Sequence, residues 1–221
     1  MKLIGIGALT LLTSMSFAAP VWYNGDDDGI GGFAALSGTP NGQNNAEFVE
    51  FEDFTWNSAS NASTVMGTMV GTTIFSSINW EIRQGMNVGT NNVGTVVASG
   101  SFAPTLVSLG PWSVSNSFTE YKMTGSIGSV ALTNGGNYFL GMAIVVPNPT
   151  FTGGFTTTSG LNSVGSPVNN KNAFSMTPAG ALSDDGAVNL SMGIGTASVP
   201  EPASVAVLGL GVVALLRRRR K

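Results

Sequence analysis

The sequence places oxygen-bearing side chains at alternate positions near its N-terminus. In residues 24–29 (NGDDDG), Asn24, Asp26 and Asp28 occupy positions 1, 3 and 5, and a glycine follows at position 6. This is the first half of a calcium loop, but a complete EF-hand loop needs a bidentate glutamate at position 12, where this chain has Ala35. Two interpretations stay open. The three side chains hold calcium together with loop carbonyl groups, or they form an acidic turn in water.

Glu50 and Glu52 are the best candidates for paired catalytic carboxylates. On a strand they share one face, with Asp53 on the other. Glycoside hydrolysis needs two carboxyl groups about 5 to 10 Å apart on opposite sides of the scissile bond. Neighbours on one strand approach from the same side, so a partner would have to come from Glu81 or Glu120. Each of those has a cation two residues further on, which predicts ordinary ion pairs.

Two tryptophans are candidates for stacking on sugar rings. Trp22 and Trp112 each lie beside turn residues, where an aromatic face can be exposed. Trp80, by contrast, alternates with Ile78 and Ile82 and is expected in the core. For Trp22 and Trp112 the alternative is packing at the edge of the core.

The chain contains no histidine and no cysteine, which excludes several kinds of chemistry. A Ser-His-Asp triad and a Cys-His pair cannot be assembled, and zinc lacks its usual nitrogen and sulfur ligands. We therefore expect no enzymatic activity, and calcium is the only cofactor for which the residues leave room. Without disulfides, stability must come from sheet packing and burial.

These residues are positioned by short strands. Alternation of apolar and polar residues with a period of two recurs between turn residues, and no amphipathic helix interrupts it. The predicted strands are 47–56, 65–75, 78–83, 93–102, 112–123, 127–132, 138–146, 173–176 and 188–194. This pattern predicts an all-β fold, an antiparallel β-sandwich of jelly-roll type.

Two stretches are expected to be loops, 24–45 and 147–172, because Gly, Asn, Asp, Ser and Thr dominate them. The second contains threonines at 150, 152 and 156–158, which raises an ice-binding hypothesis. Flat ice-binding faces need regularly repeated threonines, and this cluster has no repeat, so a solvated loop is the simpler prediction.

The C-terminal residues form a three-part tail. Val199, Pro200, Glu201 and Pro202 precede an apolar run at 203–216, and Arg217, Arg218, Arg219, Arg220 and Lys221 end the chain. The prolines keep the first part extended, and the basic cluster holds its own end on the cytoplasmic side of a membrane. The 14 apolar residues make a helix of about 21 Å against a hydrocarbon core of about 30 Å, a difference that snorkelling arginines and bilayer thinning can cover.

This tail resembles the PEP-CTERM sorting signal of Gram-negative bacteria. The resemblance implies cleavage at residues 200–202 by a membrane-embedded exosortase, and similar tails also occur on ice-binding proteins. The body resembles a secreted module that precedes such tails. That resemblance rests on loose strand and turn patterns at 23–25, 52–54, 80–85, 94–100, 135–141 and 164–170, and it implies no catalytic residues.

The N-terminal residues agree with export. Lys2, the apolar stretch 3–12 and the small residues Ser16, Ala18 and Ala19 follow the order of a secretory signal peptide. We predict cleavage by signal peptidase after Ala18, with Ala19 as the alternative site. A retained N-terminal anchor is the other interpretation.

The charge of the body argues against nucleic acid as a partner. The whole chain carries 9 basic and 12 acidic residues, but Lys2 and the five C-terminal cations account for six of the basic ones. From residue 19 to residue 202, three cations face twelve carboxylates, a net charge of −9. Phosphate backbones repel such a body.

The sequence therefore predicts five segments: signal peptide 1–18, β-sandwich ectodomain 19–196, linker 197–202, transmembrane helix 203–216 and basic cytoplasmic tail 217–221. We expect an exported protein that is anchored transiently in the inner membrane and then reaches the cell surface or extracellular matrix. A structural or adhesive role in exopolysaccharide or biofilm is expected, with polysaccharide as the outer partner. The alternatives are a carbohydrate-binding module, and behind it a carboxylate-based glycosidase or an ice-binding protein.

Overall fold

The computed structural model describes residues 20–37, 48–145 and 151–197, and the statements below concern these residues. The predicted signal peptide, its cleavage site at Ala18 or Ala19, the motif at 199–202, the apolar run and the basic tail lie outside them. Residues Ala19–Ala197 belong to one compact unit. In the described ranges, no helix is long and apolar enough to cross a bilayer.

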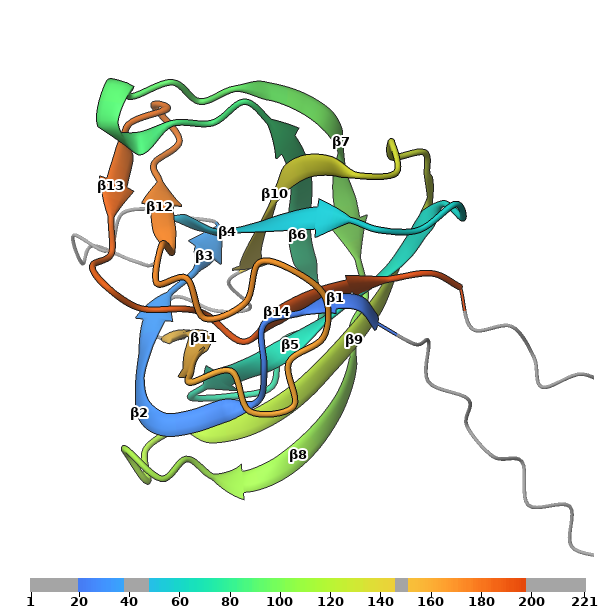
Figure 1. Cartoon of the computed structure of the whole chain (residues 1–221). Coiled ribbons are helices and arrows are strands. Elements are labelled where there is room, and N and C mark those ends of the chain that lie inside the picture. The colour runs from blue at the N-terminus through green and yellow to red at the C-terminus, as the bar shows by residue number, and fades with distance from the viewer. Residues whose placement is uncertain (1–19, 38–47, 146–150, 198–221) are drawn as a thin grey trace, which may run out of the picture. The chain divides into compact units, whose positions relative to one another are not determined.

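The fold is all-β, with two seven-stranded sheets (Figure 1). Sheet A contains β1 (Pro20–Tyr23), β2 (Asp27–Ala34), β5 (Ala62–Gly71), β8 (Thr105–Pro111), β9 (Thr119–Val130), β11 (Gly153–Thr158) and β14 (Met192–Gly195). Sheet B contains β3 (Leu36–Ser37), β4 (Val49–Trp56), β6 (Ile78–Gln84), β7 (Thr95–Phe102), β10 (Gly136–Val145), β12 (Phe174–Met176) and β13 (Leu182–Asp184). One 3-10 turn, η1 (Val88–Thr90), lies between β6 and β7.

Strand pairing is antiparallel except where β3 runs parallel to β10. In sheet A, the long strand β5 pairs with β9 along one side and with β14 and β11 along the other. In sheet B, β10 lies between β4 and β6, and β7 forms one edge. Each sheet therefore mixes strands from distant parts of the sequence.

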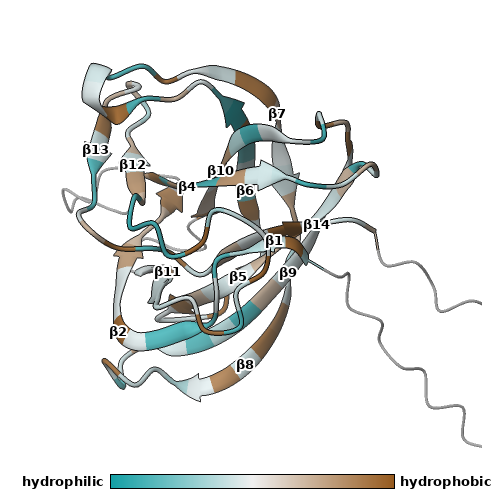
Figure 2. Ribbon diagram, in the orientation of Figure 1, coloured by the Kyte–Doolittle hydropathy of each residue, from teal (hydrophilic) through white to brown (hydrophobic). Residues whose placement is uncertain are grey.

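The core lies between the sheets and takes side chains from both. Ile78, Trp80 and Ile82 of β6 are buried in it, as their alternation predicted. Trp22 of β1 and Met123 of β9 join the same cluster from sheet A. Hydrophobic residues recur along strands of both sheets (Figure 2). This arrangement is consistent with the predicted antiparallel β-sandwich.

The two predicted loops contain strands, which corrects the sequence-based expectation. β2 lies within 24–45, and β11 within 147–172, where Thr156, Thr157 and Thr158 are buried rather than solvated. β11 pairs with β5 on one side and β2 on the other. Non-local pairing thus overrides the weak strand propensity of these Gly-rich segments.

Two further differences concern β8 and β9. β8 was not predicted, and β9 is one continuous strand where two were expected. Gly125 and Gly128 interrupt the apolar pattern of β9, but pairing with β5 continues from Thr119 to Val130 with one irregularity. Pairing with β5 spans these glycines, whereas β8 pairs only with the part of β9 that precedes them.

Candidate functional site

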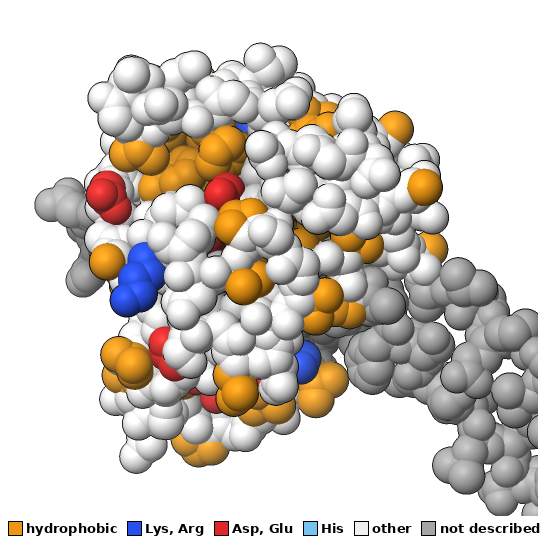
Figure 3. Space-filling view, in the orientation of Figure 1, with side chains coloured by type: hydrophobic (Ala, Val, Ile, Leu, Met, Phe, Trp, Pro, Cys, Tyr) orange, Lys and Arg blue, Asp and Glu red, His pale blue; other side chains and the backbone are white. Residues whose placement is uncertain are grey.

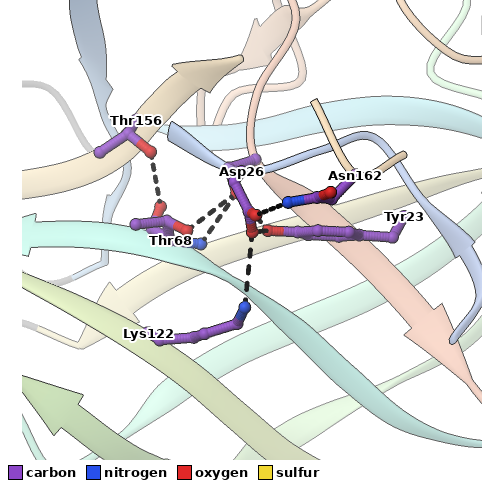
Figure 4. Close-up of polar contacts among 7 residues, drawn as sticks. Tyr23, Asp26, Thr68, Lys122, Thr156 and Asn162 are labelled. Carbon is purple, nitrogen blue, oxygen red and sulfur yellow. Dashed lines mark hydrogen bonds and ion pairs between the residues drawn. The ribbon is translucent and has the colours of Figure 1, made fainter. Parts of the chain in front are cut away.

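Asp26, one of the three predicted calcium ligands, belongs to a hydrogen-bonded network on sheet A (Figure 4). Tyr23 ends β1, and its hydroxyl donates to Asp26 Oδ1 at 2.8 Å. The same hydroxyl lies 3.1 Å from Ser191 Oγ. Asn162 Nδ2 donates to Asp26 Oδ2 at 2.7 Å, and Lys122 Nζ lies 3.4 Å from Asp26 Oδ1. Asp26 therefore joins three segments of the chain that are distant in sequence.

The network continues into buried structure. Ser191 Oγ donates to Thr68 Oγ1 at 3.0 Å, and Thr156 Oγ1 donates to the Thr68 carbonyl at 3.3 Å. Burial is the main cause that raises the pKa of Tyr23 far above its usual value. Burial also acts to raise the pKa of Asp26, but the hydrogen bonds from Asn162 and Tyr23 and the charge of Lys122 lower it. A neutral phenol and a fully engaged carboxylate suit a structural role.

The predicted calcium loop does not assemble. Asn24 is fully buried, and its Oδ1 accepts a hydrogen bond from Asn169 N at 3.1 Å. Asp28 Oδ1 accepts from Thr157 Oγ1 at 2.7 Å, while Asp26 binds the different partners described above. In the part of the chain that the structure describes, no group of three or more acidic residues is placed to hold a metal ion. Asp28 lies on strand β2, so the three side chains do not belong to one continuous loop.

Neither predicted sugar-stacking tryptophan presents a face to solvent. Trp22 is fully buried, and its Nε1 donates to the Pro167 carbonyl at 2.6 Å. Trp112 is 7% exposed and packs edge-on against Phe118, with ring centroids 6.0 Å apart. The packing alternative describes both residues, since Trp22 belongs to the main core cluster and Trp112 packs on Phe118.

Glu50 and Glu52 share one face of β4, as predicted, but that face is the interior. Phe54 and Trp56, at the following positions of the same parity, belong to the main core. Glu50 is 2% exposed and Glu52 is fully buried. Glu52 Oε1 accepts a hydrogen bond from the backbone nitrogen of Leu190. A substrate cannot reach carboxyl groups enclosed in this way.

The buried carboxyl groups have strongly altered acidity. Burial raises the pKa of Glu50 to about 10, helped by a hydrogen bond with Asp185 and by the charges of Asp185 and Glu52. Burial likewise raises the pKa of Glu52 well above its usual value, against the effect of its bond with Leu190. Ser175 Oγ, opposite Glu50 on β12, donates to Asp185 Oδ1 at 3.1 Å. Glu50 is therefore protonated at neutral pH, and the raised pKa of Glu52 likewise disfavours an anionic nucleophile or base.

The remaining candidate carboxylates are separated. Glu81 forms an ion pair with Arg83 at 2.9 Å, as their spacing predicted. Glu120 does not pair with Lys122, which instead contacts Asp26. Burial, then the charges of Asp27 and Asp26, raises the pKa of Glu120. Glu81 is thus engaged by Arg83, and Glu120 lies on sheet A, whereas Glu50 and Glu52 lie on sheet B.

A pocket that sequence reasoning missed opens on the outer face of sheet B. It encloses about 240 Å³. Its lining comes from β3, β4, β6, β12 and two connections: Leu36, Val49, Arg83, Val93, Met176, Thr177, Pro178 and Gly180. Hydrophobic side chains gather in this hollow in Figure 3. No local pattern marks it, because its residues come together only through the pairing of β4 with β12.

A buried ion pair lies beside this pocket. The side chains of Glu81 and Arg83 are 14% and 13% exposed, and Arg83 Nη1 donates to the Val93 carbonyl at 3.0 Å. Glu81 Oε1 and Arg83 Nε are buried without a hydrogen-bond partner in the structure. Apolar walls with a few convergent polar groups are typical of sites for small ligands.

The described ranges thus form an all-β body with two sheets and a pocket on the outer face of sheet B. Comparison with protein families identifies a PEP-CTERM protein-sorting motif at residues 198–221. The motif implies export and a sorting step in which the C-terminus is anchored in a membrane, with processing by exosortase. The tail resemblance is therefore confirmed. The search of curated proteins found no match.

Among solved structures, the chain is similar to the cysteine protease and lectin-like domains of Cwp84, a surface-layer-associated protein of Clostridium difficile. The sequences are 16% identical, the TM-score is 0.41, and the match covers 68% of this chain. The match covers 32% of that structure, about a third of its length.

Proposed function

We propose that this protein is a non-enzymatic structural or adhesive component of the cell surface or of the surrounding polysaccharide matrix. The observation that carries the proposal is the sorting motif at 198–221 joined to a compact body at Ala19–Ala197. The proposal assigns residues 1–18 to a signal peptide, 203–216 to a transient membrane anchor and Pro200–Pro202 to the exosortase site. The mixed strand order of both sheets supports a jelly-roll arrangement of the sandwich.

The burial of the paired carboxyl groups of β4 is consistent with a non-enzymatic role. The two carboxylates best placed for acid–base work, Glu50 and Glu52, are enclosed in the core. Asp26 is held by Tyr23, Asn162 and Lys122. A body of this kind contributes bulk, stability and surface rather than chemistry.

Mass spectrometry of the surface fraction tests the sorting step. The released protein is expected to end close to residues 200–202, and a variant with Pro200→Ala, Glu201→Ala and Pro202→Ala is expected to stay in the membrane fraction. An intact Arg217–Lys221 terminus in the released wild-type protein would contradict the proposal. The matrix role has its own test, because a deletion strain should retain less extracellular polysaccharide and recover it on complementation.

A second candidate function is binding of a neutral sugar residue in the pocket beside Arg83. The supporting observation is the pair of unsatisfied atoms, Glu81 Oε1 and Arg83 Nε, next to apolar walls. Vicinal hydroxyl groups suit such a pair, while the apolar face of a sugar ring suits Val49 and Met176. A glycan array with the secreted protein, with and without calcium, tests this role. Binding that an Arg83→Met variant retains in full would refute it.

A further inference from the structure

The first and last strands of the body are neighbours. Pro20 of β1 lies opposite Gly195 of β14 in an antiparallel pair. β14 in turn pairs with β5, where Gly195 lies opposite Thr64. The chain therefore enters and leaves the sandwich at one point, at the end of sheet A where β5 begins.

The connections at this end of the molecule are linked to one another. Thr64 lies opposite Ser126 of β9, and Asn61 Nδ2 donates to Ser129 Oγ at 2.8 Å. The β4–β5 and β9–β10 connections lie on the same side of the sandwich as the outer ends of β1 and β14 (Figure 1). We call this surface the tether end and define it as residues 57–61 and 126–136 together with Pro20 and Gly195.

No side chain in the tether end is charged. Residues 54–66, 123–136 and 190–197 contain no Asp, Glu, Lys or Arg. Exposed residues here are small and uncharged, such as Asn57, Ala59 and Asn134. All acidic residues in the described ranges lie outside these segments. The strongly acidic body thus has one uncharged end, and it is the end from which the C-terminal tail leaves.

The connection to the sorting motif is short. Four residues, 196–199, separate Gly195 from Pro200. Fully extended, they reach about 14 Å beyond the end of β14. As long as the tail is anchored, the tether end is held within a few Debye lengths of the membrane, since one Debye length is about 8 Å at physiological ionic strength.

We propose that the tether end is the face that the folded body presents to the anionic phospholipid surface during sorting. Carboxylates at this position would be repelled by the lipid phosphates and would hold the cleavage motif away from the membrane. An uncharged end approaches without that cost, while the acidic residues lie elsewhere on the body. This inference rests on the proposed sorting function and adds the orientation in which the body is processed.

The test introduces charge at the tether end of the full-length precursor. One variant combines Asn57→Asp, Ala59→Asp and Asn134→Asp, and a second places lysine at the same three positions. A matched control combines Thr73→Asp, Ser76→Asp and Asn116→Asp, which are exposed residues beyond the other ends of β5 and β9. Pulse–chase labelling in the native host measures the lifetime of the precursor, and thermal unfolding checks that each variant folds.

We expect the tether-end aspartates to lengthen the precursor lifetime by about threefold or more, and the lysines to leave it equal or shorter. The control should behave like wild type. Equal lifetimes for all variants would overturn the inference. Slowing by both signs of charge would also overturn it and assign this face to contact with the processing enzyme. Failure of wild type to be processed at all would instead refute the sorting function itself.

Discussion

The hydroxyl of Tyr23 donates a hydrogen bond to Asp26 Oδ1 at 2.8 Å and so joins strand β1 to the first loop of the body (Figure 4). Tyr23 is 6% exposed, whereas Asp26 lies at the surface and also contacts Lys122 and Asn162. Through this bond, the buried hydroxyl groups of Tyr23, Ser191 and Thr68 are connected to a carboxylate at the surface. Both carboxylate oxygens of Asp26 therefore have partners within the protein.

Tyr23→Phe should destabilise the protein modestly. It removes the hydroxyl shared by Asp26 and Ser191 while leaving the ring in place. We expect a loss of about 1 to 2 kcal/mol in the free energy of unfolding, measured by urea denaturation. Tyr121→Phe is the control, because no hydrogen bond joins that hydroxyl to a described residue. Equal stability of Tyr23→Phe and wild type would show that the network contributes nothing.

Trp22→Ala should act on stability and not on binding. The ring is fully buried and its Nε1 is bonded to the Pro167 carbonyl. Removing it is expected to cost about 3 to 5 kcal/mol, visible as a lower urea midpoint. Truncation of the exposed Val114 should change stability by less than about 0.5 kcal/mol. A stable Trp22→Ala protein that had lost sugar binding would restore the stacking hypothesis.

Stability should fall as pH rises from about 5 to about 10. Burial raises the pKa of Glu50 to about 10 and that of Glu52 well above its usual value, so both hold a proton in the folded state that they release on unfolding. Their stabilisation is complete below the unfolded pKa, near 4.5, and is lost as pH rises toward the folded pKa, with a slope of up to about 1.4 kcal/mol per pH unit per group.

Glu50→Gln tests that dependence, because the amide cannot ionise. The variant should show a flatter fall of Tm between pH 5 and 9 and should be more stable than wild type at pH 9. Thr55→Ala, on the opposite face of the same strand, is the control and should leave the slope unchanged, because it alters no ionisable group. A wild-type Tm that rises over this pH range would contradict the prediction.

Calcium should have no effect on thermal stability. A ligand that binds only the folded state raises Tm, and the oxygens of Asn24, Asp26 and Asp28 are divided among different protein donors. Tm measured with millimolar calcium is therefore expected to equal Tm measured with a chelator. A calcium-dependent rise that Asp26→Asn abolishes would re-establish the metal site.

Much of the sandwich could be predicted from local pattern. Ile78, Trp80 and Ile82 alternate with polar residues, and a period of two specifies which side chains share a face. The same rule put Glu50 and Glu52 together. A signal for their burial was also present, because Phe54 and Trp56 continue the same face. Acidic residues are usually exposed, which argued against burial of Glu50 and Glu52. Carboxyl groups can nevertheless be buried when they are neutral.

The strands β2 and β11 could not be predicted in this way. Their glycines and threonines have no apolar alternation, and they are strands because β11 lies between β5 and β2. The pocket beside Arg83 has the same origin, since its walls come from segments more than a hundred residues apart. The local sequence pattern does not indicate which distant segments will pair.

The sequence by itself determined the sorting tail, the charge of the body and the exclusion of histidine and cysteine chemistry, because these depend only on residue type and order. Tertiary structure alone decided that Trp22 and Glu50 are enclosed, that Asp26 is held by Tyr23, and that Pro20 meets Gly195 at an uncharged end. The physical reason is that burial and charge environment are set by strand pairing between distant segments. Alternation within one strand can indicate its buried face, as in β6, but it does not specify which distant strands pair with it.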